Sequence, residues 1–159
     1  MEYFTIGVYN STADHFFSKI IENNIDVFVD IRQRRGVRGA KYAFVNSKRL
    51  QDRLAEMNVK YLHVIDLAPT KEIRELQKVA DKQKSEQKRE RQKLGDVFRI
   101  EYKNRIIKNF NFSEFLKQLQ YINAKKVVFF CVEEHPEACH RSLVADKLEK
   151  EFDCRINHL

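Results

Sequence analysis

The sequence is short of the residues on which disordered, membrane-spanning and disulfide-bonded chains depend. Its 159 residues include only four glycines and two prolines, and 43% are hydrophobic, a composition typical of compact globular proteins. No apolar run approaches the roughly 18 to 20 residues that a membrane span needs. Three widely spaced cysteines argue against a disulfide framework, so we expect a reducing, cytoplasmic setting and no membrane partner.

Positive charge is concentrated in two segments of the chain, whose net charge is +7. Residues 32–49 hold seven lysines or arginines and no acid, and residues 71–93 hold nine against five acids. The rest of the chain is therefore net negative. Local basicity of this kind indicates an anionic partner, although a solvated face rich in lysine and glutamate gives the same pattern.

Short apolar strands alternate with amphipathic helices along the chain. Strands are expected over 3–8, 25–31, 59–65, 127–132 and 152–157, and helices over 13–22, 47–57, 71–93, 97–108, 113–122 and 136–151. This alternation predicts a single α/β domain over 1–159, with a mostly parallel central sheet of about five strands. Helices should cover both faces in a Rossmann-like, three-layer arrangement.

The expected helix over 71–93 is long, basic and poor in apolar residues. Its second half, from residue 81 onward, has no large apolar side chain. We therefore expect that half either to project into solvent or to dock on something acidic.

The densest group of reactive side chains follows the most apolar of these strands, at residues 127–132. Ligand sites of open α/β sheets lie beyond the carboxyl ends of the strands. Other polar residues end the strands expected at 25–31 and 59–65, and right-handed crossovers would bring all three ends to one edge of the sheet. The residues expected in this crevice are Arg32, His63, Glu133, His135, Cys139, His140 and Arg141.

The same pieces, in this order, resemble the family named domain of unknown function DUF488. The matching stretches are Phe4-Thr5-Ile6-Gly7, Val29-Asp30-Ile31-Arg32, Tyr61-Leu62-His63, Cys131-Val132-Glu133, Pro136-Glu137 and Cys139-His140-Arg141-Ser142. The resemblance implies a compact α/β domain in which Asp30, Arg32, His63, Glu133, Cys139, His140 and Arg141 lie near a common site. It implies no activity.

Chemistry suggests a role for each member of this cluster. Arg32 and Arg141, with Asp30 beside them, are candidates for binding an anion, because the forked guanidinium matches phosphate and carboxylate groups. The alternative is that these arginines form ion pairs that lock the loops.

Proton transfer and nucleophilic attack have their own candidates. His63, Glu133 and His140 could move a proton. Cys139 is a candidate nucleophile, because we expect it in the first turn of a helix, where positive charge lowers the pKa of a thiol. The alternative is that Cys139 is a core residue.

A metal site is the next alternative. Cys131, His135, Cys139 and His140 offer two sulfur and two nitrogen atoms. Zinc sites usually show closely spaced cysteine pairs, whereas these two cysteines lie eight residues apart. We therefore assign no metal, and the sequence identifies no cofactor.

The basic loop over 33–41 gives a second candidate surface. Arg34, Arg35, Arg38 and Lys41 are candidates for nucleic-acid binding, with Tyr42 close enough in sequence to stack on a base. No phosphate-binding loop of the Walker type and no nucleic-acid reader motif is present.

Together these features predict binding of a phosphate-bearing ligand, a nucleotide or a nucleic acid, by residues that are also candidates for acting on it. The alternative function is a non-enzymatic nucleic-acid-binding or interaction module that uses the arginine-rich loop and the basic helix.

Overall fold

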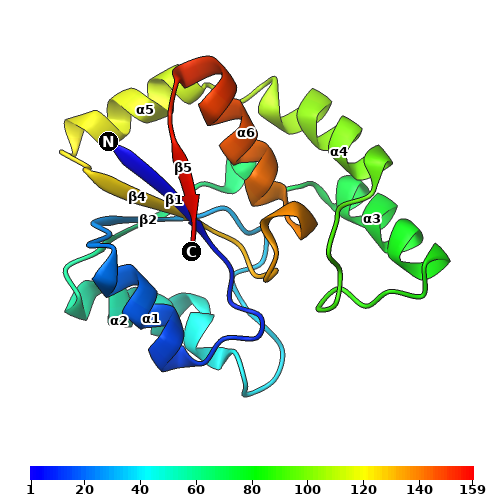
Figure 1. Cartoon of the computed structure of the whole chain (residues 1–159), viewed down its shortest axis with the longest axis horizontal. Helices are drawn as coiled ribbons and strands as arrows, with labels where there is room; N and C mark the ends of the chain where they lie inside the picture. The colour runs from blue at the N-terminus through cyan, green and yellow to red at the C-terminus, as the bar shows by residue number, and fades with distance from the viewer.

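Five short apolar strands form one sheet in which every neighbouring pair is parallel. A computed structural model describes residues 1–159 and has the strand order β3-β2-β4-β1-β5 (Figure 1). The strands are β1 Glu2–Ile6, β2 Val27–Asp30, β3 Lys60–His63, β4 Lys126–Phe130 and β5 Ile156–His158. The central strand β4 is buried along nearly its whole length, as its continuous apolar sequence requires. The predicted α/β class and parallel sheet are therefore confirmed.

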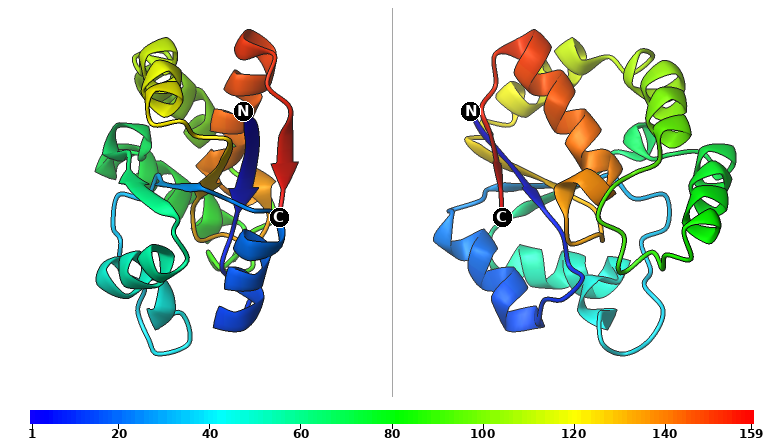
Figure 2. Two further views of the ribbon diagram at one scale, coloured as in Figure 1. Left: turned by 90° about the vertical axis from the view of Figure 1, so that its left-hand side faces the viewer. Right: turned by 45° about the vertical axis from the view of Figure 1, so that its right-hand side comes forward.

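The chain forms six α-helices, with shorter helical turns between them. The α-helices are α1 Ala13–Glu22, α2 Ser47–Glu56, α3 Lys71–Gln83, α4 Asp96–Tyr102, α5 Phe112–Tyr121 and α6 His140–Phe152. The 3-10 turns are η1 Ala43–Val45, η2 Ile65–Leu67 and η4 Pro136–Ala138, and η3 Lys103–Ile107 is a π-helical turn. Helices α1 and α2 lie on one face of the sheet, and α5 and α6 lie on the other (Figures 1 and 2). Inward-facing side chains of the helices and the sheet form one cluster of 40 buried hydrophobic residues. None of the helices is both long and apolar enough to cross a membrane.

Asparagine ends several helices in this glycine-poor chain. Asn24, Asn58 and Asn123 follow α1, α2 and α5 in the left-handed region, with φ of 53°, 57° and 58°. Asparagine tolerates this conformation better than other residues that carry a Cβ. Short, sharp helix ends are therefore obtained without glycine.

The connections between strands place the most important loops in the middle of the sheet. Strand β2 pairs with β4, so the segments that follow them start side by side. The chain leaves β2 toward α2 on one face and leaves β4 toward α6 on the other. In open α/β sheets a crevice forms where neighbouring strands send their chains to opposite faces.

The charged segment over 71–93 is not one helix, which corrects the prediction. Helix α3 ends at Gln83, and Ser85 takes a left-handed φ of 52° that turns the chain. The following residues run back along the molecule to Leu94, whose N–H donates to the carbonyl of Glu137. The acidic group on which this half docks lies within the chain itself, because Arg91 pairs with Asp81 and Glu133.

Candidate functional site

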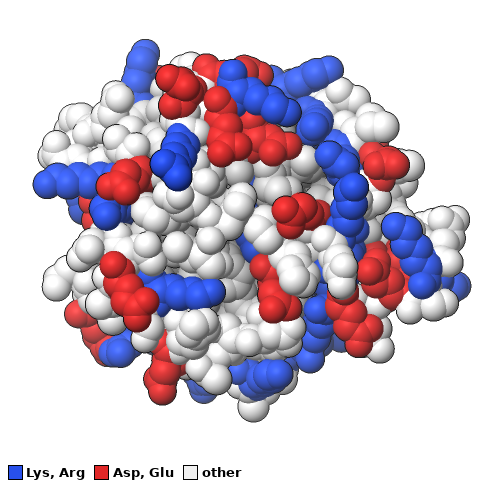
Figure 3. Space-filling view, in the orientation of Figure 1, with Lys and Arg blue, Asp and Glu red and all other residues white.

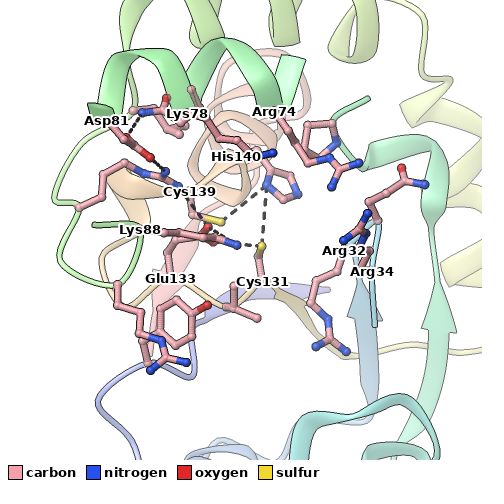
Figure 4. A pocket seen from close by; sticks show the side chains of 18 of the residues that line it. Arg32, Arg34, Arg74, Lys78, Asp81, Lys88, Cys131, Glu133, Cys139 and His140 are labelled. Atoms are coloured by element: carbon pink, nitrogen blue, oxygen red, sulfur yellow. Dashed lines mark hydrogen bonds and ion pairs between the residues drawn. The ribbon is translucent and has the colours of Figure 1, made fainter. Parts of the chain in front are cut away.

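A cavity of about 710 Å³ lies beyond the carboxyl ends of β2 and β4. Its walls come from the loop after β2, from α3 and the segment that follows α3, from the end of β4 and from the start of α6 (Figure 4). Eight basic side chains line it against two acidic ones. The basic residues are Arg32, Arg34, Arg38, Arg74, Lys78, Lys88, Arg89 and Arg91, and the acidic ones are Asp81 and Glu133. Figure 3 shows lysine and arginine gathered, with acids between them, on the side of the molecule where α3 and α4 lie.

Arg32 is held rigidly at the end of β2. Its Nε and Nη2 atoms donate to the Asp30 carboxylate over 2.9 and 2.7 Å, and Nη2 also donates to the carbonyl of Val45. The Tyr61 hydroxyl donates to the same carboxylate over 2.8 Å. Arg32 is 3% exposed, and its Nη1 atom has no hydrogen-bond partner. The guanidinium carbon also lies 4.5 Å from the ring centroid of Phe130, so the side chain is fixed by both polar and aromatic contacts.

Glu133 lies at the centre of a buried charge network. Its Oε1 atom is 3.1 Å from Nη2 of Arg91 and 3.3 Å from Nζ of Lys88. Arg91 also donates to Asp81 over 2.8 Å and to the carbonyl of Ala138 over 3.2 Å. Burial alone would raise the pKa of Glu133, but the adjacent Lys88 and Arg91 outweigh it and hold that pKa well below its usual range. Glu133 is therefore a poor proton donor near neutral pH.

Two thiols and one imidazole meet beside this network. Nδ1 of His140 is 3.8 Å from Sγ of Cys131 and 3.7 Å from Sγ of Cys139, and all three residues are buried (Figure 4). Nε2 of His140 lies 3.0 Å from the carbonyl of Ile31, so this nitrogen carries a proton and donates it to that carbonyl. Nδ1 is then the atom that faces both sulfurs.

The two thiols have different electrostatic surroundings. Burial would raise the pKa of Cys139, but the neighbouring Cys131 thiol and the adjacent His140 lower it to about 5. Burial raises the pKa of Cys131, which also donates to the Glu133 carboxylate over 3.2 Å. Cys139 is the N-cap residue of α6 and not part of its first turn, which corrects the expected position. A thiolate on Cys139 next to an imidazolium on His140 is chemically favoured here.

Arg141 lies outside the cavity and acts on the backbone. Its Nη1 and Nη2 atoms donate to the carbonyls of Glu133 and Glu134, and the side chain is 1% exposed. A Cβ at Gly7 would come within 2.0 Å of the Glu133 carbonyl oxygen and 3.1 Å of Nη2 of Arg141. Gly7 and Arg141 therefore fix the loop after β4, and nothing in this position favours the expected contact between Arg141 and an anion.

His63 lies at the expected edge of the sheet but does not line the cavity. Its Nε2 atom is 2.9 Å from the carbonyl of Arg32, and its ring borders a separate hollow formed with η3 and α5. His135 is half-exposed and lies 3.9 Å from Glu134, away from the sulfurs. The structure thus brings together Asp30, Arg32, Glu133, Cys139 and His140 of the expected set.

The arginine-rich loop is divided between two surroundings. Arg34 and Arg38 line the cavity, whereas Arg35 and Lys41 do not. Nζ of Lys41 lies 5.3 Å from the ring centroid of Tyr42. The loop therefore contributes two cations to the cavity and leaves two outside it.

Several cavity residues were not among the expected site residues. They are Tyr9, Arg74, Lys78, Asp81, Lys88, Arg89 and Arg91. Most of them come from the segment that the sequence treats as one solvated helix. One feature of the sequence indicates that this segment departs from the helix: it has no large apolar residue between Asp81 and Lys93.

These features define a five-stranded parallel α/β protein with a basic cavity and a buried cysteine–histidine cluster at its central strand ends. The chain belongs to the family described as Domain of unknown function DUF488, which matches residues 12–148 and confirms the resemblance. Neither the curated proteins nor the solved structures gave a match to the chain.

Proposed function

We propose that this protein binds a phosphate-bearing ligand of about nucleotide size in the basic cavity. A volume of about 710 Å³ falls within the range of about 300 to 1,000 Å³ that small-molecule sites occupy. Arg34, Arg38 and Arg74 would contact the phosphate groups, because guanidinium donors match phosphate oxygens in pairs, and Arg32 adds positive charge to the wall.

The excess of positive charge in the cavity wall carries this proposal. Eight lysine or arginine side chains line the cavity against two carboxylates. Both carboxylates are already paired with cations of the same wall. A phosphate group offers several acceptor oxygens and could contact more than one of the remaining guanidinium groups at once.

The remaining charges of the wall support an anion more than a cation. Lys88 and Arg91 neutralise Glu133, and Arg91 also neutralises Asp81. Arg34 and Arg38 have no carboxylate partner within ion-pair distance, so their charge is available to a ligand. His140 and Cys139, at the inner wall, are the candidates for acting on whatever binds there.

The test is a calorimetric titration of adenosine triphosphate and of inorganic pyrophosphate into matched double variants. Arg34→Ala with Arg38→Ala removes two cavity cations, and Arg35→Ala with Lys41→Ala removes two from the same loop outside the cavity. Charge-assisted hydrogen bonds contribute about 1.5 to 3 kcal/mol each, so we expect the first pair to weaken binding by at least about 10-fold. The second pair should change Kd by less than about 3-fold.

The alternative is a nucleic-acid-binding module in which all four loop cations contact phosphates. Such a module would lose affinity similarly in both double variants, would bind a DNA or RNA oligonucleotide in a strongly salt-dependent way, and would keep that affinity in Cys139→Ala and His140→Ala. Equal losses in the two double variants would therefore contradict the cavity proposal.

A further inference from the structure

The buried cysteine–histidine cluster has the composition of a metal site. Cys131 comes from the end of β4, and Cys139 and His140 begin α6. One ligand atom from each lies within 4.8 Å of the other two. The seven residues between the cysteines form a loop that returns to its starting point, so the separation of the two cysteines in sequence does not keep their sulfurs apart.

The sulfur–nitrogen distances fit a tetrahedral ion. Zinc bonds of about 2.3 Å to sulfur and about 2.05 Å to nitrogen place sulfur and nitrogen ligands about 3.6 Å apart at the tetrahedral angle. The corresponding distances here are 3.8 Å for Cys131 and 3.7 Å for Cys139, both to Nδ1 of His140. The two sulfurs lie within 4.8 Å of each other, and one tetrahedral ion would bring them to about 3.8 Å. Binding therefore requires the two sulfurs to approach by no more than about 1 Å.

The surroundings of His140 are those of a metal ligand. A histidine that binds metal through one nitrogen usually donates its other N–H to a carboxylate or a backbone carbonyl, which fixes the ring. Nε2 of His140 has such a partner in the carbonyl of Ile31, 3.0 Å away. The Tyr102 ring packs against the imidazole with centroids 5.4 Å apart and further limits its rotation.

Charge around the sulfurs favours the thiolate form in which cysteines bind a metal. Lys88 and Arg91 lie beside the cluster through their pairs with Glu133. Positive charge stabilises thiolates, the form in which cysteine binds metals. Two thiolates would neutralise a divalent ion.

From this geometry we infer that Cys131, Cys139 and His140 bind one Zn²⁺ ion, with the fourth coordination position open to the basic cavity. All three residues line that cavity, so a water or a ligand oxygen can reach the ion from it. Two cysteines, one histidine and an open position form a set used by catalytic zinc sites. In the loaded protein Cys139 is a metal ligand and not a nucleophile. The site stands independently of the phosphate-bearing ligand proposed above.

The first experiment measures the metal itself. The full chain, produced without a histidine tag and dialysed against metal-free buffer, should retain about one zinc ion per chain by mass spectrometry of the metal content. After removal of zinc with a chelator, Co²⁺ should restore absorption from thiolate-to-cobalt charge transfer together with the intense visible bands of tetrahedral cobalt. Both measurements use the unaltered chain, so they do not depend on whether a variant folds.

Variants identify the ligands. Loss of a group that only supports a metal ligand typically weakens metal binding about 10- to 100-fold. Cys131→Ser and Cys139→Ser each remove a ligand itself and should weaken zinc binding by more than this. Cys154→Ser is the matched control, because Cys154 is the remaining cysteine and lies outside the cluster. Circular dichroism checks that each variant is folded. An unaltered chain without thiolate-to-cobalt absorption, or folded Cys131→Ser and Cys139→Ser chains that bind zinc as tightly as Cys154→Ser, would overturn the inference.

Discussion

Replacing Arg91 by methionine should release the segment that forms one wall of the basic cavity. The guanidinium is 6% exposed and holds three groups, the Asp81 and Glu133 carboxylates at 2.8 and 3.1 Å and the carbonyl of Ala138 at 3.2 Å. Methionine keeps much of the side-chain length but none of these bonds. Both carboxylates would then lie at a buried position with too little positive charge around them.

The magnitude follows from the burial of the network. Removing one partner of a buried ion pair costs about 3–5 kcal/mol, because the other charge stays buried without compensation. Lys88 remains 3.3 Å from Glu133 but is half-exposed, so it offsets only part of the loss. We therefore expect a cost of about 3 kcal/mol, which corresponds to an opening of the segment about 100-fold more frequent.

Amide hydrogen exchange reports this opening directly. The N–H of Leu94 donates to the carbonyl of Glu137 over 2.9 Å, and the N–H of Gly95 donates to Oε1 of Gln77 over 2.9 Å. Both amides should exchange about 100-fold faster in Arg91→Met. Lys93→Met makes a similar change at an exposed position of the same segment and should leave both rates within about 3-fold. Unchanged rates in Arg91→Met would refute the role given to the network.

Three further predictions concern the frame of the site. Gly7→Ala should lower the free energy of unfolding by about 2–3 kcal/mol in urea denaturation, because its Cβ would meet the Glu133 carbonyl oxygen at 2.0 Å. Gly36→Ala is the control and should cost less than about 0.5 kcal/mol, because its Cβ would meet no atom nearer than Oδ1 of Asn46 at 4.0 Å. Burial and the Asp30 carboxylate raise the pKa of Tyr61 to about 12 from 10.0. The contribution of Tyr61 to stability is therefore present below pH 10 and is lost as the pH rises through about 12. Tyr61→Phe should reduce the loss of unfolding free energy between these pH values. An unchanged slope of unfolding free energy against pH would contradict this assignment. Asp30→Ala should cost about 3–5 kcal/mol in the same urea assay, because it leaves the Arg32 guanidinium buried and unpaired, and a cost below about 1 kcal/mol would show that the pair does not hold Arg32 in place.

The fold could be predicted because local pattern and global architecture agree. The apolar run from Val127 can be buried only in a central strand, and strands separated by helices favour parallel pairing. Parallel pairing then places the ends of β2 and β4 at one edge, which is why Asp30, Arg32 and Glu133 could be expected to lie close together.

The direction of individual side chains could not be predicted in the same way. The sequence does not reveal that η4 ends before Cys139, so the thiol was expected one position too far into the helix. Arg141 follows the clustered His140 directly, but helical geometry turns it to the opposite side, onto the loop carbonyls. His63 is turned away from the cavity by its contact with the Arg32 carbonyl.

The segment after Gln83 was mispredicted for a different physical reason. Its residues favour a helix locally, and the ion pairs of Arg91 override that preference through contacts with residues 10 and 42 positions away in the chain. Such long-range pairs leave no periodic signal. The same limitation applies to Cys131 and Cys139, whose sulfurs meet only because the loop between them closes.

The position of the phosphate groups in a crystal structure of the chain grown with adenosine triphosphate tests the central claim most directly. We expect phosphate oxygens within hydrogen-bond distance of the Arg34 and Arg38 guanidinium groups, with a further contact to Arg74. A nucleotide bound elsewhere on the surface, or a cavity in which Arg34 and Arg38 meet only water at saturating nucleotide, would contradict the claim.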